Sequence, residues 1–118
     1  MTETKYTEIF RFKEMLEQAE IPFVYTDRSY PLAIPLFDGK KQYTHYHIEY
    51  PEGVPTDKRV CSVIQGYGSY GGQANLLEIM GLLTPEEEQE SSVCGFLTAE
   101  EVFERIKKHY ENEKDNAN

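Results

Sequence analysis

The stretch that decides the fold is residues 59–83, RVCSVIQGYGSYGGQANLLEIMGLL. It is the most apolar and least charged part of the 118-residue chain, so we expect the core to form around it. Residues 60–65 are rich in β-branched side chains, which is typical of a central strand. After the glycines we predict a helix over residues 73–80, ended by Gly81 as its C-terminal cap.

Three glycines in this stretch have the spacing of a dinucleotide-binding fingerprint, Gly66-x-Gly68-x-x-Gly71. That fingerprint also needs a second parallel strand with an acidic residue about 20 positions further on. Here the corresponding region reads PEEEQESS, which is typical of a turn and a helix start. We therefore expect a tight turn and no cofactor. Nucleotide or anion binding at the turn between Gly66 and Gly72 is the alternative.

The residues before this stretch predict a helix and then an antiparallel sheet. Residues 4–19 place Ile9, Phe12 and Leu16 on one side, with charged residues opposite them. An Asp38-Gly39 pair then signals a hairpin turn. The predicted strands are residues 23–26, an edge strand over residues 32–37 that follows Pro31 and contains Pro35, and residues 41–50.

The last of these strands alternates along its length, because successive side chains of a strand point to opposite faces of the sheet. One face carries four residues that we expect to face the core: Thr44, Tyr46, Ile48 and Tyr50. The other face carries Tyr43, His45, His47 and Glu49.

The pattern His45-x-His47-x-Glu49 offers two imidazoles and a carboxylate on that second face. These are suitable ligands for zinc or a redox metal, although a site needs at least one more ligand from elsewhere. A solvent-facing polar side of the strand explains the pattern more simply. A metal-dependent hydrolase or nuclease that uses these three residues is an alternative function.

A short motif occurs twice near the C-terminus, as GLLTPEE from Gly81 and as GFLTAEE from Gly95. Each copy has the form of a capping box, in which Thr84 or Thr98 precedes a helix with Glu87 or Glu101 three residues later. We therefore predict one short helix from residue 85 and a longer one over residues 99–110.

The net charge is −9, and it is uneven. Residues 1–59 carry eight Lys/Arg against ten Asp/Glu, whereas residues 60–118 carry four against eleven. This acidity disfavours nucleic-acid binding and is typical of an ordinary soluble cytosolic protein. An acidic face that docks on a basic partner is the alternative. The predicted contact surface comprises the turn residues Tyr67, Ser69 and Tyr70 and the acidic residues Glu86, Glu87, Glu88 and Glu90.

The two cysteines, Cys61 and Cys94, lie far apart and form no CxxC pair, so we expect reduced thiols. The N-terminus does not read as a signal peptide, and no stretch has the length of a membrane span. These features predict a cytoplasmic protein that does not bind membranes.

The segments VCSVIQGYGSYGG, LLEIMGLLTPEE and VCGFLTAEEVFERI resemble small uncharacterised proteins of phages and prophages of Gram-positive bacteria. The resemblance spans roughly residues 59–108, about half of the chain. It implies an origin in a mobile element and a cytoplasmic setting in the host. It implies no activity and no functional residues.

These observations predict an α+β fold with an N-terminal helix, a mainly antiparallel sheet of three to four strands, and two to three C-terminal helices. We expect a single domain over residues 1–112 and a frayed polar tail over residues 113–118. The predicted function is protein interaction rather than catalysis, with an unidentified protein partner and a homodimer as one arrangement.

Overall fold

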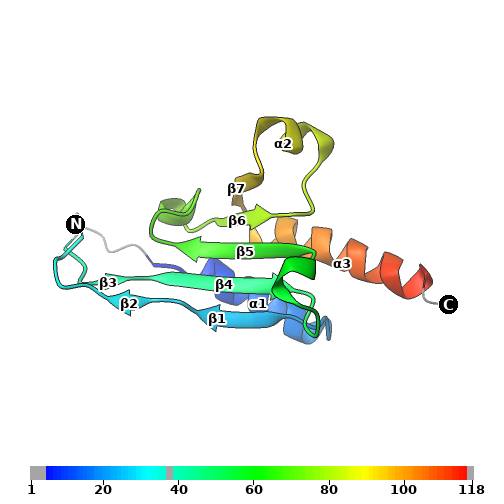
Figure 1. Ribbon diagram of the computed structural model, residues 1–118, viewed down its shortest axis with the longest axis horizontal. Helices are drawn as coiled ribbons and strands as arrows, with labels where there is room; N and C mark the ends of the chain where they lie inside the picture. The colour runs from blue at the N-terminus through cyan, green and yellow to red at the C-terminus, as the bar shows by residue number, and fades with distance from the viewer. Residues whose placement is uncertain (1–4, 37–38, 117–118) are drawn as a thin grey trace.

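The computed structural model describes residues 5–36 and 39–116, and it confirms the predicted α+β class (Figure 1). Among these residues no helix is long and apolar enough to cross a membrane. The helices are α1 (Glu8–Gln18), α2 (Pro85–Glu90) and α3 (Ala99–Asn116), with 3-10 turns η1 (Thr56–Lys58) and η2 (Gly72–Ala74). The strands are β1 (Val24–Asp27), β2 (Tyr30–Pro31), β3 (Gln42–Tyr43), β4 (His45–Tyr50), β5 (Cys61–Gly66), β6 (Leu77–Met80) and β7 (Val93–Leu97).

The main sheet has five strands in the order β1-β4-β5-β6-β7, and every neighbouring pair is antiparallel. Strands β2 and β3 form a separate antiparallel pair beyond one end of β1 and β4 (Figure 1). Their connection includes residues 37–38, so the Asp38 half of the predicted hairpin turn lies outside the described residues. The first strand of this pair, β2, covers only Tyr30–Pro31, so the edge strand predicted over residues 32–37 is wrong for its described part, residues 32–36, which form no strand.

Helices α1 and α3 lie behind the sheet in Figure 1 and pack against each other and against strands β4, β5 and β6. Within the described residues no α-helix covers the opposite face of the sheet, and we call it the helix-free face. Helix α2 stands beyond β6 and β7, clear of the sheet (Figure 1). The sheet therefore has one covered face, which forms the core, and one face that can meet a ligand or partner.

The core lies between the sheet and the two helices, and the predicted alternation of β4 is confirmed. Ile48 and Tyr50 are buried, and Tyr46 packs against the core. Helix α1 contributes Ile9, Phe12 and Leu16, all fully buried, as its spacing predicted. The other buried apolar residues are Ile21, Cys61, Val63, Leu77, Ile79, Leu97, Ala99, Val102 and Ile106. Burial raises the pKa of the Cys61 thiol to about 12, so this cysteine is an unreactive core residue.

The prediction of a helix over residues 73–80 is wrong. The chain makes one 3-10 turn, passes through Asn75 in the left-handed region (φ 57°), and then continues as strand β6. Leu77 and Ile79 are fully buried, whereas Glu78 and Met80 point to the helix-free face. This period of two belongs to a strand, and it raises the main sheet beyond the three to four strands predicted.

The C-terminal part also differs from prediction in extent. Residues 93–97, for which we predicted no strand, form the edge strand β7. Helix α3 begins at Ala99, as predicted, but continues to Asn116, well past the predicted end at residue 110 and into the expected tail. Apolar side chains on the inner side of α3, including Val102 and Ile106, anchor its first half to the core.

Candidate functional site

The glycine-rich segment is a compact loop rather than the start of a helix. Ser69 Oγ donates to the carbonyl of Gly66 (2.8 Å) and accepts from its N–H (3.0 Å). A Cβ on Gly72 would lie 2.5 Å from the carbonyl oxygen of Gly66, so only glycine allows this close approach. The predicted tight turn is therefore present, but no helix N-terminus follows it to face a phosphate.

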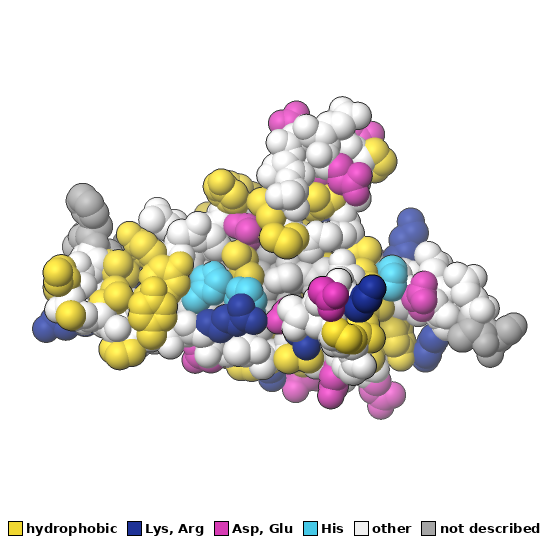
Figure 2. Space-filling view, in the orientation of Figure 1, with side chains coloured by type: hydrophobic (Ala, Val, Ile, Leu, Met, Phe, Trp, Pro, Cys, Tyr) yellow, Lys and Arg dark blue, Asp and Glu magenta, His cyan; other side chains and the backbone are white. Residues whose placement is uncertain are grey.

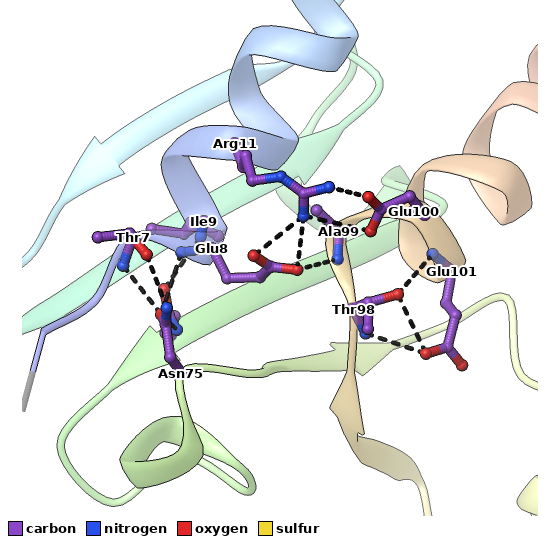
Figure 3. A network of polar contacts seen from close by, with 10 residues as sticks. Thr7, Glu8, Ile9, Arg11, Asn75, Thr98, Ala99, Glu100 and Glu101 are labelled. Atoms are coloured by element: carbon purple, nitrogen blue, oxygen red, sulfur yellow. Dashed lines mark hydrogen bonds and ion pairs between the residues drawn. The ribbon is translucent and has the colours of Figure 1, made fainter.

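Asn75, which ends this loop, caps helix α1 instead (Figure 3). Its Oδ1 accepts from the backbone N–H groups of Thr7 (2.9 Å) and Glu8 (3.1 Å), and its Nδ2 donates to Thr7 Oγ1 (2.6 Å). The fully buried Gln65 accepts the next N–H of the helix, that of Ile9 (3.0 Å). The helix N-terminus nearest the glycine motif is thus occupied by the protein's own side chains.

Helix α3 is capped in the same way, by a residue of α1. Glu8 is buried, and its Oε2 accepts from the backbone N–H of Ala99 at 2.7 Å (Figure 3). Arg11 contacts both Glu8 and Glu100, which ties the starts of the two helices together. These contacts hold the starts of α1 and α3 together on the helix-covered face of the sheet.

The predicted turn residues have three different roles. Tyr67 packs edge-on against Tyr43 on the helix-free face, with ring centroids 5.7 Å apart. Ser69 is used inside the loop, as described above. Tyr70 alone projects outward, with 60% of its surface exposed.

Phe96 lies beside Tyr70 and is the most exposed aromatic residue described, at 64%. The pairing of β6 with β7 shifts between Leu77–Leu97 and Ile79–Cys94, so that Gly95 and Phe96 together oppose Glu78. This is a β-bulge, a device that redirects a side chain at a sheet edge. Phe96 has a φ of 60°, a left-handed conformation that costs a residue with a Cβ about 1–2 kcal/mol.

A hollow of about 320 Å³ lies between Phe96 and the glycine loop. We call it the Phe96 hollow, and it is lined by Gly68, Ser69, Tyr70, Gly71, Gln73, Ala74 and Phe96. The loop is held against β7 by the N–H of Phe96, which donates to the carbonyl of Tyr70 (3.3 Å). The N–H of Tyr70 donates to Glu78 (2.8 Å). Both exposed rings are therefore held on fixed backbone.

The residues of the predicted acidic surface have two different roles in the structure. Both predicted capping boxes are present, at Thr84–Glu87 and at Thr98–Glu101. Glu87 also receives two hydrogen bonds from Arg105, at 2.7 and 2.8 Å, and the guanidinium lowers the pKa of this carboxyl to about 2. Its role is structural, whereas the side chains of three neighbours are exposed: Glu86, Glu88 and Glu90.

The residues of the predicted metal site share the helix-free face, as their alternation indicated. The rings of His45 and His47 are 4.8 Å apart. Glu49 is only 7% exposed and accepts from Arg28 (3.2 Å) and Arg59 (2.9 Å). Within the described residues, no group of three or more His, Cys, Asp or Glu side chains is arranged to hold a metal ion.

Both histidines are held toward their neutral form. Burial, followed by the positive charge of Arg28, lowers the pKa of His45, and it lowers that of His47 to about 4. Figure 2 shows histidine side chains on this face next to basic side chains, beside an apolar patch over the β2–β3 end. Tyr30 and Tyr43, whose rings stack at 5.0 Å, belong to that end.

Phe96, Arg28 and Arg59 are the site residues that we did not predict. The repeated motif places Phe96 at the position of Leu82, and the structure gives both residues a positive φ (60° and 52°). Each copy thus follows its glycine with a left-handed residue, which turns the chain toward the threonine cap. No such local pattern connects Arg28 and Arg59, which meet only at Glu49.

Comparisons of the chain with models of protein families, with curated proteins and with solved structures find no match.

Proposed function

We propose that the protein is a non-enzymatic binding module that holds an apolar side chain of a protein partner in the Phe96 hollow. The observation that carries this proposal is the position of Phe96. Its ring is exposed to solvent by a backbone conformation that glycine would adopt without strain. Strain of this kind persists where the surrounding structure enforces it, and it is concentrated at functional sites.

The hollow has the properties of a preorganised contact site. Its two aromatic rings, Tyr70 and Phe96, are anchored through backbone hydrogen bonds to each other's segments and to Glu78. Rigid aromatic anchors are enriched where protein interfaces gain most of their binding energy. Fixed backbone also reduces the entropy that a partner must overcome on binding.

The charge of the chain favours a basic partner. The net charge is −9, and α2 presents Glu86, Glu88 and Glu90 to solvent beyond the far end of β7. A partner with an apolar side chain for the hollow and Lys or Arg nearby would complement both features. From the resemblance stated for residues 59–108 we further propose a partner encoded by a phage or by its bacterial host.

Site-specific photo-crosslinking in bacterial cells tests the proposal. A benzophenone-bearing phenylalanine analogue replaces Phe96 in one variant and Phe10 in a control variant. Phe10 is also an exposed phenylalanine, at 40%, but lies on α1. We expect a discrete protein adduct from position 96 that is absent from position 10. An adduct of twice the chain's mass would identify a second copy as the partner.

A second variant separates binding from folding. Phe96→Gly relieves the left-handed strain, so its free energy of unfolding should be unchanged or raised, within about 1 kcal/mol. The same substitution should prevent recovery of the crosslinked partner in a pull-down, while Phe10→Ser retains it. Identical adducts from positions 96 and 10, or none from position 96, would refute the proposal.

A further inference from the structure

A second hollow, of about 360 Å³, lies on the helix-free face at the end of β4. We call it the His47 hollow. It is separate from the Phe96 hollow and shares none of its residues. Its polar lining consists of His47, Glu49, Thr56, Arg59 and Ser62, and Met80 contributes an apolar edge.

The charges around this hollow are unbalanced. Glu49 is the buried acceptor for two guanidinium groups, Arg28 through Nη2 and Arg59 through Nη1. One carboxylate thus faces two arginines, which leaves one positive charge in excess beside the hollow. Arginine stays protonated in proteins, so this excess persists at any ordinary pH.

Two buried nitrogen atoms of the lining residues have unused hydrogen-bonding capacity. Arg59 Nε and His47 Nδ1 have no hydrogen-bond partner within the part of the chain that the structure describes. A buried polar atom without a partner costs about 1–3 kcal/mol, so a ligand oxygen at these atoms would be favourable. Arg59 Nε always carries a hydrogen and can only donate.

We propose that the His47 hollow binds a carboxylate group, with one carboxylate oxygen accepting a hydrogen bond from Arg59 Nε. A carboxylate carries the single negative charge that balances the excess arginine. It also matches the planar edge of a guanidinium, to which it can make parallel hydrogen bonds. The Nη1 atom of Arg59 already contacts Glu49, so the Nε edge is the part left for a ligand.

His47 completes the site as a neutral ring. With its pKa lowered to about 4, chiefly by burial, it holds one hydrogen at neutral pH and can donate that hydrogen from Nδ1 to the ligand. The inference goes beyond the proposed function, because it depends on neither Phe96 nor the partner. The carboxylate can come from a free small molecule or from an aspartate or glutamate of a protein.

Two-dimensional NMR of the 15N-labelled chain tests the inference with acetate as the probe and sodium chloride at equal ionic strength as the reference. We expect saturable shifts of the Arg59 Nε–H and of the Ser62 amide. A capped peptide with one glutamate is titrated in parallel. Tighter binding of the peptide would identify a protein carboxylate as the ligand, and equal binding a small molecule.

Arg59→Lys is the decisive variant, because it keeps the positive charge but removes the Nε–H. It should weaken acetate binding about tenfold, as loss of a charge-assisted hydrogen bond does. Arg28→Lys is the matched control, since Arg28 contacts the same Glu49 but does not line the hollow. Equal effects of the two variants, or shifts no larger than those from chloride, would overturn the inference.

Discussion

The side-chain oxygen of Asn75 lies 2.9 Å from the backbone nitrogen of Thr7, although 68 positions separate the two residues. Through this contact the glycine loop, which resembles a cofactor motif in sequence, serves as the N-terminal cap of helix α1. A residue in a left-handed conformation provides the cap, and asparagine tolerates that conformation better than most. The contact therefore joins the first helix to the centre of the sheet.

Replacing Asn75 should destabilise the fold in two separable steps. Asn75→Gly keeps the left-handed backbone but loses the cap, and should lower the free energy of unfolding by about 1–2 kcal/mol. Asn75→Ala also introduces backbone strain and should cost about 1 kcal/mol more. Urea denaturation followed by circular dichroism measures both values. An Asn75→Gly variant with the wild-type free energy of unfolding would show that the cap does not stabilise the fold.

The Glu87–Arg105 pair should make stability depend on pH in the acid range. The folded-state pKa of Glu87, about 2, lies below its ordinary value of 4.5. The contribution of this carboxylate is therefore complete above pH 4.5 and is lost as the pH falls toward 2. We expect Glu87→Gln to lose less stability than the wild type across this range. Glu86→Gln, at an exposed neighbour, should follow the wild type in the same denaturation series.

His47 should make stability fall in the same direction, with decreasing pH, but in a higher pH range. Its pKa falls from 6.5 to about 4 on folding, so the unfolded chain takes up a proton that the folded chain excludes. The fold should therefore lose stability as the pH decreases from 6.5 to 4, with no further loss from this group below that. His47→Gln should reduce this dependence, as measured by urea denaturation at both ends of the range. NMR titration of the His47 ring gives its pKa directly.

Gly66 should tolerate no side chain. An added Cβ would lie 2.3 Å from the carbonyl oxygen of Thr44 and 2.8 Å from the Cα of His45, both on the neighbouring chain segment. Gly66→Ala must push the backbone apart and should cost about 2 kcal/mol or more. Gly53→Asn is the control, because the space around Gly53 is open and asparagine accepts its positive φ. Similar thermal midpoints for the two variants would contradict this interpretation.

Local patterns predicted some of these features well. The alternation in β4 separated Ile48 and Tyr50, which are buried, from His45 and His47 on the helix-free face, because a half-buried strand must alternate. The capping boxes at Thr84 and Thr98 were also predicted correctly, because their glutamate partners lie only three residues away.

Features that depend on distant residues were not predictable in this way. Residues 73–80 have apolar residues that suit either a short helix or a strand, and pairing of Leu77 with Leu97 decides between them. The meeting of Arg28 and Arg59 at Glu49 likewise requires three separate segments to be placed first. The sequence showed neither arrangement, because no local spacing encodes them.

The capping of α1 has a consequence for how the chain is made. A ribosome releases the first helix before it has synthesised Gln65 and Asn75, whose side chains accept the N–H groups of Thr7, Glu8 and Ile9. Glu8 in turn receives the N–H of Ala99, at the start of the last helix. A nascent chain that stops before residue 75 therefore lacks the Asn75 cap of its first helix. The contact between the first and last helices can form only after synthesis has passed residue 99.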